Sequence, residues 1–267
     1  GISHTQSDQR NKGFKLMAEL DRRYEQTVGR ADVGAIDEGL RSYMLRVYNY
    51  MASGVAITGV VAYVIYSMSV VTGADGSITG LTSFGNLMYA SAFKWIVIFA
   101  PLAMVFFLSF KIQSLSVGTA QMLFWLFSAL MGASISSIFL VYAGESIARV
   151  FFITAAAFGA LSLWGYTTKK DISGWGSFLF MGLIGIILAS LVNLFIGSTA
   201  LQFAVSVIGV LVFAGLTAYD TQQIKEMYSV NDDGTVAGKK AVMGALRLYL
   251  DFINLFMMLL QLLGDRR

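Results

Sequence analysis

Two aspartates in the last two apolar segments of the chain are the residues best placed to do chemistry. Asp220 follows Tyr219 near the end of one long apolar segment, and Asp251 lies inside the next. A charge at membrane depth costs several kcal/mol unless it is paired or hydrated. Each of these carboxyls is therefore a candidate functional group. Segments that are adjacent in sequence usually pack together, and we therefore expect the two carboxyls to approach each other.

A close pair of carboxylates resists simultaneous ionisation and can share one proton. The same oxygens are the ligands that calcium prefers in proteins. A proton and a cation would then compete for one site, and this competition is the mechanism that the pair predicts. Two simpler interpretations stay open: Asp220 lies at the helix end in ordinary contact with water, or Asp251 pairs with Arg247 one helical turn earlier.

Three further charged residues are candidate partners. Glu145 and Arg149 stand four residues apart, which predicts an outer polar pair in the form of an interfacial salt bridge. Lys111 closes the second apolar segment and could pair with either aspartate. A lysine at this position more often extends its ammonium group to the lipid headgroups.

The composition excludes several classes of site. The sequence has no cysteine and one histidine, His4, in the polar N-terminal tail. A thiolate metal site, a Cys nucleophile, and a multi-His or Ser–His site within the membrane are therefore excluded. The net charge of +3 is spread along the loops, which does not favour nucleic-acid binding. We expect no enzyme activity and no cofactor, with calcium as a transported or bound ion.

The elements that position these residues are predicted to be membrane-spanning helices. Charged residues make up 13% of the chain, about half the share in a soluble domain. Seven apolar blocks of about 18–26 residues can each cross the bilayer as a helix, and none alternates as a barrel strand would. The blocks are Val47–Val71, Phe93–Phe110, Val117–Tyr142, Ser146–Tyr166, Gly176–Ile196, Thr199–Thr221 and Met243–Leu263.

The chain therefore divides into a polar tail, 1–46, and a transmembrane domain of seven helices, 47–267. The tail ends in apolar residues at helical spacing, from Ile36 through Leu40, which predicts an amphipathic helix in the membrane interface. Basic residues mark the tail and the even-numbered loops, including a polar loop at Ser229–Lys240. This pattern predicts a cytoplasmic N-terminus and a C-terminus outside.

The segments around the two aspartates resemble the Bax inhibitor family, also called the transmembrane BAX-inhibitor-motif family, and specifically its bacterial members. The similarity is most specific at Thr217–Ile224 and at Leu248–Phe256 with Arg247 before it. Gly144–Phe152 and Thr168–Ser173 are also similar, and the resemblance covers all seven apolar blocks.

The resemblance implies an all-α membrane fold in which the C-terminal helix lies centrally, wrapped by the other six. It also implies a pH-sensitive calcium leak of the bacterial inner membrane, with Asp220 and Asp251 as the sensor. In bacterial members an arginine near the cytoplasmic end of the second helix latches the closed state. Here Ser109–Gln113 has no arginine and offers only Lys111, which lacks the planar fork that arginine uses for a bidentate grip.

Two other functions stay open at this point. A non-transporting regulator that binds another membrane protein, such as a membrane protease, would have the same seven helices. An intramembrane aspartyl protease also pairs Tyr-Asp on one helix with Asp on the next, as Tyr219-Asp220 would allow. Its second aspartate needs small neighbours, however, whereas Asp251 follows the bulky Leu248–Leu250.

Overall fold

The computed structural model describes the backbone of residues 3–267 and the side chains of residues 15–20, 22–23 and 38–267. The chain divides into two compact units, Gly1–Tyr43 and Met44–Arg267, and helix α1 (Ser3–Ser69) has residues in both. The first unit is helical in its described backbone. The predicted amphipathic pattern includes Ile36, whose side chain lies outside the described residues, so the interfacial helix stays a prediction.

Seven helical segments in the described chain are long and apolar enough to cross a membrane, which confirms the all-α prediction. Apolar side chains remain exposed on their outer faces, where lipid would cover them; Phe180 and Leu188 are examples. The segments are Glu38–Ser69, Phe93–Ser114, Val117–Val141, Gly144–Thr167, Trp175–Ile196, Thr199–Glu226 and Gly234–Leu263.

The helices of these segments after α1 keep close to the predicted blocks, except that α9 begins nine residues before its block, and the third segment is divided. Ser136 and Ser137 separate α4 from α5, and the Ser136 hydroxyl donates to the carbonyl oxygen of Ala133 at 2.8 Å. Such a bond competes with the helical hydrogen-bond ladder. The helices are α3 (Phe93–Lys111), α4 (Val117–Ile135), α5 (Ile138–Val141), α6 (Gly144–Thr167), α7 (Trp175–Ile196), α8 (Thr199–Glu226) and α9 (Gly234–Leu263), with a short helical turn η2 (Ile112–Ser114) after α3.

The first connection after α1 is more ordered than a loop. Strands β1 (Val70–Thr72) and β2 (Ile78–Leu81) form an antiparallel hairpin, followed by α2 (Ser83–Gly85) and the turn η1 (Asn86–Ala90). Gly76 has a φ of 79° in the hairpin turn, a conformation that glycine adopts without steric cost.

The predicted polar loop at Ser229–Lys240 is wrong in its second half, because α9 begins at Gly234. The side chain of Asp233 accepts a hydrogen bond from the backbone N–H of Val236 at 2.8 Å and so caps the helix. The ammonium group of Lys240 pairs with Asp232 at 2.5 Å, which fixes the turn before the helix. The cap and this ion pair extend α9 into residues that are too polar to be recognised as part of a spanning helix from the sequence.

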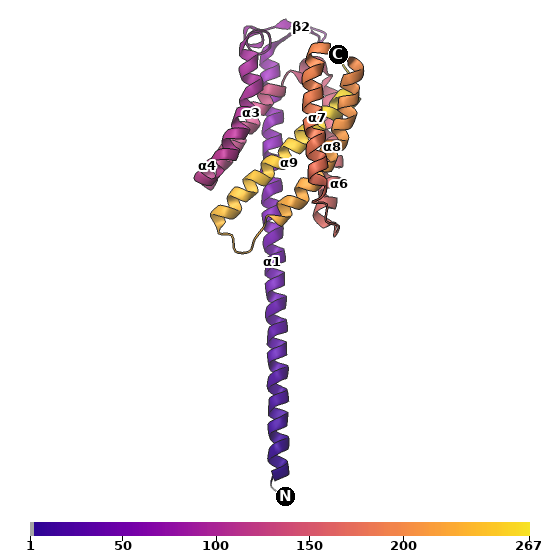
Figure 1. Ribbon diagram of the computed structural model, residues 1–267. Helices are drawn as coiled ribbons and strands as arrows, with labels where there is room; N and C mark the ends of the chain where they lie inside the picture. The colour runs from indigo at the N-terminus through magenta and orange to yellow at the C-terminus, as the bar shows by residue number, and fades with distance from the viewer. Residues whose placement is uncertain (1–2) are drawn as a thin grey trace. The chain divides into compact units, whose positions relative to one another are not determined.

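Helices α8 and α9 pack antiparallel, and glycines set their register. A Cβ built on Gly209 of α8 would meet Met258 at 2.8 Å, and one built on Gly244 of α9 would meet Ile224 at 3.0 Å. By this register the first two turns of α9 extend beyond the end of α8. There Gly238 contacts Val117 at the start of α4. Figure 1 shows that α9 runs obliquely to α1 and α7.

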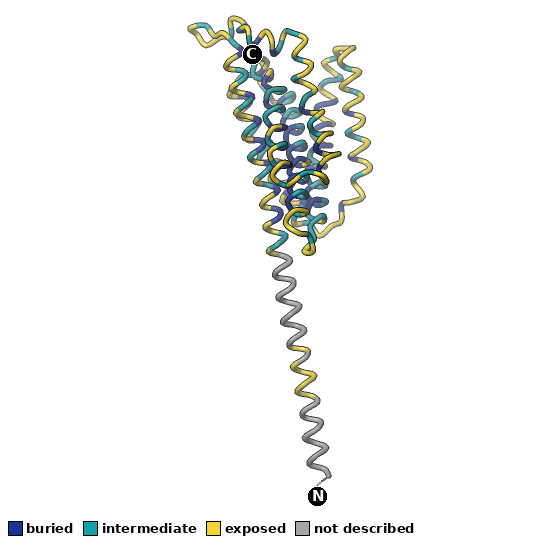
Figure 2. The backbone as a smooth tube through the Cα atoms, turned by 90° about the vertical axis from the view of Figure 1, so that its left-hand side faces the viewer, coloured by how far each residue is buried: buried dark blue, intermediate teal, exposed yellow. Residues whose placement is uncertain are grey.

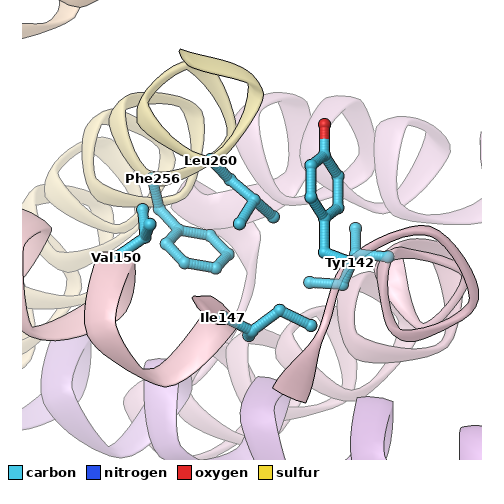
Figure 3. Close-up of a cluster of buried hydrophobic side chains, with 6 residues drawn as sticks. Tyr142, Ile147, Val150, Phe256 and Leu260 are labelled. Carbon is cyan, nitrogen blue, oxygen red and sulfur yellow. The ribbon is translucent and has the colours of Figure 1, made fainter. Parts of the chain in front are cut away.

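Helix α9 is the most buried of the spanning segments. Half of its most apolar window is buried, against 11–33% for the other six, and it packs against α8, α6 and α4. Figure 2 shows that the buried residues gather in the interior of the helix bundle. At the end of α9 away from the α8–α9 turn, Phe256 and Leu260 pack with Tyr142, Ile147 and Val150 (Figure 3). A position fully wrapped by six helices stays a prediction.

Candidate functional site

Asp220 and Asp251 meet across the contact between α8 and α9. Asp220 lies six residues before the end of α8 at Glu226, and Asp251 lies 17 residues after the start of α9 at Gly234. These positions come level because α9 begins well beyond the end of α8. The two carboxyl groups lie within hydrogen-bonding reach of each other. The structure thus brings together the two residues that the sequence singles out.

The surroundings of the two carboxyls differ. Asp251 is 4% exposed, and its Oδ2 atom has no hydrogen-bond partner. Asp220 is partly exposed and so is the member of the pair nearer to solvent. Two carboxyl oxygens can hydrogen-bond only when one of them carries a proton, because ionised carboxylates are acceptors alone. The contact is therefore a place for one shared proton.

Arg247 acts on the pair from a distance. Its side chain is exposed, one turn before Asp251, and its charge acts electrostatically on both carboxyls. No ion pair in the described part of the chain joins Arg247 to either aspartate. The simpler interpretation, in which an Arg247–Asp251 ion pair neutralises the buried carboxyl, does not match this geometry.

The pair alone does not make a complete calcium site. Within the described residues, no group of three or more His, Cys, Asp or Glu side chains lies close enough to hold a metal ion. Calcium takes about six to eight oxygen ligands. Two carboxylates supply at most four, so a bound ion would need backbone carbonyls or water as well.

Tyr249, two residues before Asp251, holds α9 against α1 and α4. Its side chain is fully buried, and its hydroxyl hydrogen-bonds the hydroxyl of Thr58. The Thr58 hydroxyl also lies 2.8 Å from the carbonyl oxygen of Ser128 and 2.9 Å from that of Gly54. The sequence gives no signal for this contact, because Thr58 is one threonine among apolar residues.

The residue after Asp220 bonds to a different helix. The hydroxyl of Thr221 lies 2.8 Å from that of Ser162 on α6, and the Ser162 hydroxyl lies 2.5 Å from that of Tyr48 on α1. Glycine brings α6 and α8 close together here, since a Cβ built on Gly165 would lie 2.4 Å from a carbonyl oxygen of α8. Small residues allow this approach of helix backbones.

Gln222 and Lys225 fasten the same end of α8 to the end of α6 and to the segment that follows it. The Gln222 amide accepts from the backbone N–H of Ile172 at 2.9 Å and donates to the carbonyl oxygen of Lys170 at 2.9 Å. Lys225 donates to the carbonyl oxygen of Tyr166 at 2.8 Å. Sequence reasoning missed the role of Gln222, although it lies inside the motif that carries the family resemblance.

Lys111 lies at the end of α3 with its side chain exposed. None of the ion pairs among the described residues joins it to Asp220 or Asp251. Its role as a charge partner therefore stays a prediction. A contact between nearby segments is made instead by Lys239 of α9, whose ammonium group donates to the carbonyl oxygen of Gln113 at 2.8 Å.

The predicted pair of Glu145 and Arg149 is replaced by another. Arg149 pairs with Asp265 at 2.8 Å, and Glu145 is exposed. The buried hydroxyl of Ser146 accepts from the backbone N–H of Asp265 at 2.8 Å, which holds the segment after α9 at the start of α6. Helical spacing favoured Glu145, but this backbone contact brings Asp265, distant in sequence, closer to the guanidinium.

Comparison with known proteins gives consistent matches. A family model described as "Inhibitor of apoptosis-promoting Bax1" matches residues 40–267. The inner membrane protein YbhL of Escherichia coli is 50% identical over 231 residues, covering 86% of this chain and 94% of that protein. Protein RP147 of Rickettsia prowazekii is 49% identical over 233 residues, covering 86% and 92%. A protein of Caulobacter vibrioides is 44% identical over 254 residues, covering 94% and 100%.

Proposed function

We propose that this chain, which belongs to the Bax inhibitor family and is an integral membrane protein, is a pH-sensitive calcium leak of a bacterial inner membrane. Its gate in this proposal is the pair of Asp220 and Asp251. The observation that carries the proposal is the approach of two carboxyls within membrane-spanning helices, one of them almost fully buried.

The proton count of the pair supports a gating role. With one proton, the carboxyl groups can hydrogen-bond and hold α8 and α9 together. With none, two negative charges about 4 Å apart repel by roughly 4 kcal/mol at an effective dielectric constant of 20. An energy of that size changes the ratio of two conformations by roughly a thousandfold, because each 1.4 kcal/mol is a factor of ten. Titration of one site can therefore shift a helix contact.

Calcium and the shared proton should compete for the same carboxyl oxygens. A calcium ion binds ionised carboxylates, so it must displace the shared proton. The calcium concentration for half-maximal flux should therefore rise as the pH falls, by up to tenfold per pH unit if one proton is displaced. The rise should be absent when either aspartate is replaced by asparagine.

The proposal favours transport over peptide hydrolysis because of the residues beside Asp251. An aspartyl protease must admit a substrate backbone next to its carboxyls. Leu248 and Tyr249 are fully buried there, and both side chains are large. These large side chains leave no room for a peptide backbone beside Asp251. A proton or a small cation could still reach the carboxyls.

Calcium flux into proteoliposomes across a range of pH tests the proposal. The variants are Asp220→Asn and Asp251→Asn, each of which keeps the side-chain shape and removes the titrating group. Asp75→Asn is the matched control, because Asp75 is an exposed turn residue distant in sequence from the pair. We expect the wild type and the control to share one pH dependence and both test variants to lose it.

Retention of that pH dependence in both test variants would overturn the gate. If the wild-type protein carried no cation at any pH, the leak itself would be wrong, and the regulator that binds another membrane protein would be favoured. Cleavage of a membrane peptide that Asp251→Asn abolishes would instead establish the protease.

A further inference from the structure

A groove lies between α7, α8 and α9. It begins near the α7–α8 turn and runs along α9 toward Asp251. Two cavities of about 270 and 410 Å³ adjoin there and share Ser190, Leu194 and Met258 in their linings. We call them together the α7–α8–α9 groove. The first cavity also contacts Asn193, Gln202 and Gln261. The second is lined mainly by apolar side chains, among them Ile186 and Phe213, and Ser190 and Asn254 are its polar residues.

The polar residues of α9 lie on one face of the helix. Asp251, Asn254 and Gln261 are separated by three and then seven residues, which is close to whole turns of a helix. Asn254 is one turn from Asp251, and side chains at that spacing are neighbours. Asn254 therefore joins the groove to the aspartate pair.

These polar groups lie well inside the spanning segments. Asn254 is nine residues before Leu263, the end of α9, which corresponds to about 14 Å along the helix. Ser190 is six residues before Ile196, or about 9 Å from the end of α7. Polar side chains at such depth are unfavourable against lipid and occur where they pair or line water-filled space.

Some of these polar groups form hydrogen bonds within the protein. The Ser206 hydroxyl donates to the side-chain oxygen of Gln261 at 2.6 Å, and Asn254 donates one N–H to the carbonyl oxygen of Leu250 at 2.8 Å. An amide side chain has a second N–H and two acceptor positions in all. The remaining capacity of Asn254 is directed to a groove large enough for several waters, since each occupies about 30 Å³.

We infer that the α7–α8–α9 groove is a water-filled vestibule that brings small hydrated cations to within one helical turn of Asp251. Its role as an ion route rests on the proposed leak, whereas its hydration does not. The ligand class is a hydrated inorganic cation, because the groove leads to the carboxyl groups of the aspartate pair, which attract cations. The amide and hydroxyl groups along the way are neutral and can replace hydration water.

Cysteine accessibility tests the vestibule directly, since the natural chain has no cysteine. Asn254→Cys and Ser190→Cys place thiols in the groove. Leu188→Cys is the matched control, because Leu188 is 57% exposed on α7 at a similar depth and does not line the groove. A charged, membrane-impermeant thiol reagent reacts with thiolates, which form in water and not in lipid. Ala200→Cys is a reference variant, because Ala200 is exposed at the start of α8, next to the α7–α8 turn. The side of the membrane from which this cysteine is labelled is the side on which the groove should open.

We expect full labelling of Asn254→Cys and Ser190→Cys from the side on which Ala200→Cys reacts, with none for Leu188→Cys, and loss of calcium flux after labelling. Both groove variants as unreactive as Leu188→Cys would overturn the vestibule, whatever the flux assay shows. Labelling that leaves a measurable flux unchanged would overturn the route while leaving the aspartate gate intact. Two groove positions guard against a variant that fails to fold.

Discussion

Replacing Thr58 by valine should destabilise the protein more than replacing Tyr249 by phenylalanine, although both changes break the same hydrogen bond. Tyr249→Phe removes one hydroxyl, and Thr58 can still donate to the carbonyl oxygen of Ser128 or Gly54. The loss is then one hydrogen bond, about 0.6–1 kcal/mol. Thr58→Val instead leaves the Tyr249 hydroxyl fully buried without its partner. An unsatisfied buried group costs about 1–3 kcal/mol.

The double variant makes the comparison sharper. Once Tyr249 is phenylalanine, the valine leaves no hydroxyl without a partner, so the double variant should be more stable than Thr58→Val alone. Unfolding of the purified protein by a denaturing detergent, followed by circular dichroism, measures the four free energies. Thr167→Val is the matched control, since exposed Thr167 bonds only to the carbonyl oxygen of Leu163, and its effect should stay within about 0.5 kcal/mol. Equal losses for the two single variants, or strict additivity in the double variant, would refute the reasoning.

Two further predictions concern a helix contact and a loop. Gly165→Ala should destabilise by about 1–3 kcal/mol, because its Cβ would lie 2.4 Å from a carbonyl oxygen of α8. Gly159→Ala, which meets nothing within 4 Å, should be neutral or stabilise by up to about 1 kcal/mol in the same detergent unfolding assay. In the loop after α6, hydrogen bonds from Ser173 hold the pKa of Asp171 below its ordinary value. The stability that they contribute is present above the unfolded-state pKa and is lost as the pH falls through the folded one. Ser173→Ala should therefore raise the Asp171 pKa, measured by carboxyl ¹³C NMR, and an unchanged midpoint would contradict the assignment.

Block length predicted the spanning helices well, because lipid leaves the backbone few alternatives. A long apolar segment in a bilayer must satisfy its own amides, so helix and span coincide. The start of α9 escaped this argument. Residues 234–242 are too polar to form an apolar block, and their helix depends on the Asp233 cap and on contacts with α4.

The aspartate pair could be predicted because both residues are unusual in their surroundings and belong to consecutive helices. The partners of ordinary polar residues could not. Gln222 bonds to backbone atoms 50 and 52 residues away, and Arg149 bonds to Asp265, 116 residues away. A backbone carbonyl has the same chemistry at every position, so sequence alone gives no reason to prefer one.

These contacts also show which helix a gate at the aspartates would leave in place. Around Asp220, α8 has four side-chain hydrogen bonds to α6 and the segment after it, made by Thr221, Gln222 and Lys225. Close to the pair, α8 and α9 meet through the carboxyls and through the contact of Gly244 with Ile224. Repulsion between the carboxyls would therefore act first on this contact, because no other hydrogen bond among the described side chains joins α8 to α9 near the pair. In the proposed gate, helix α8 then serves as the fixed side of the site, and a proton shared by the aspartates would hold α9 against it.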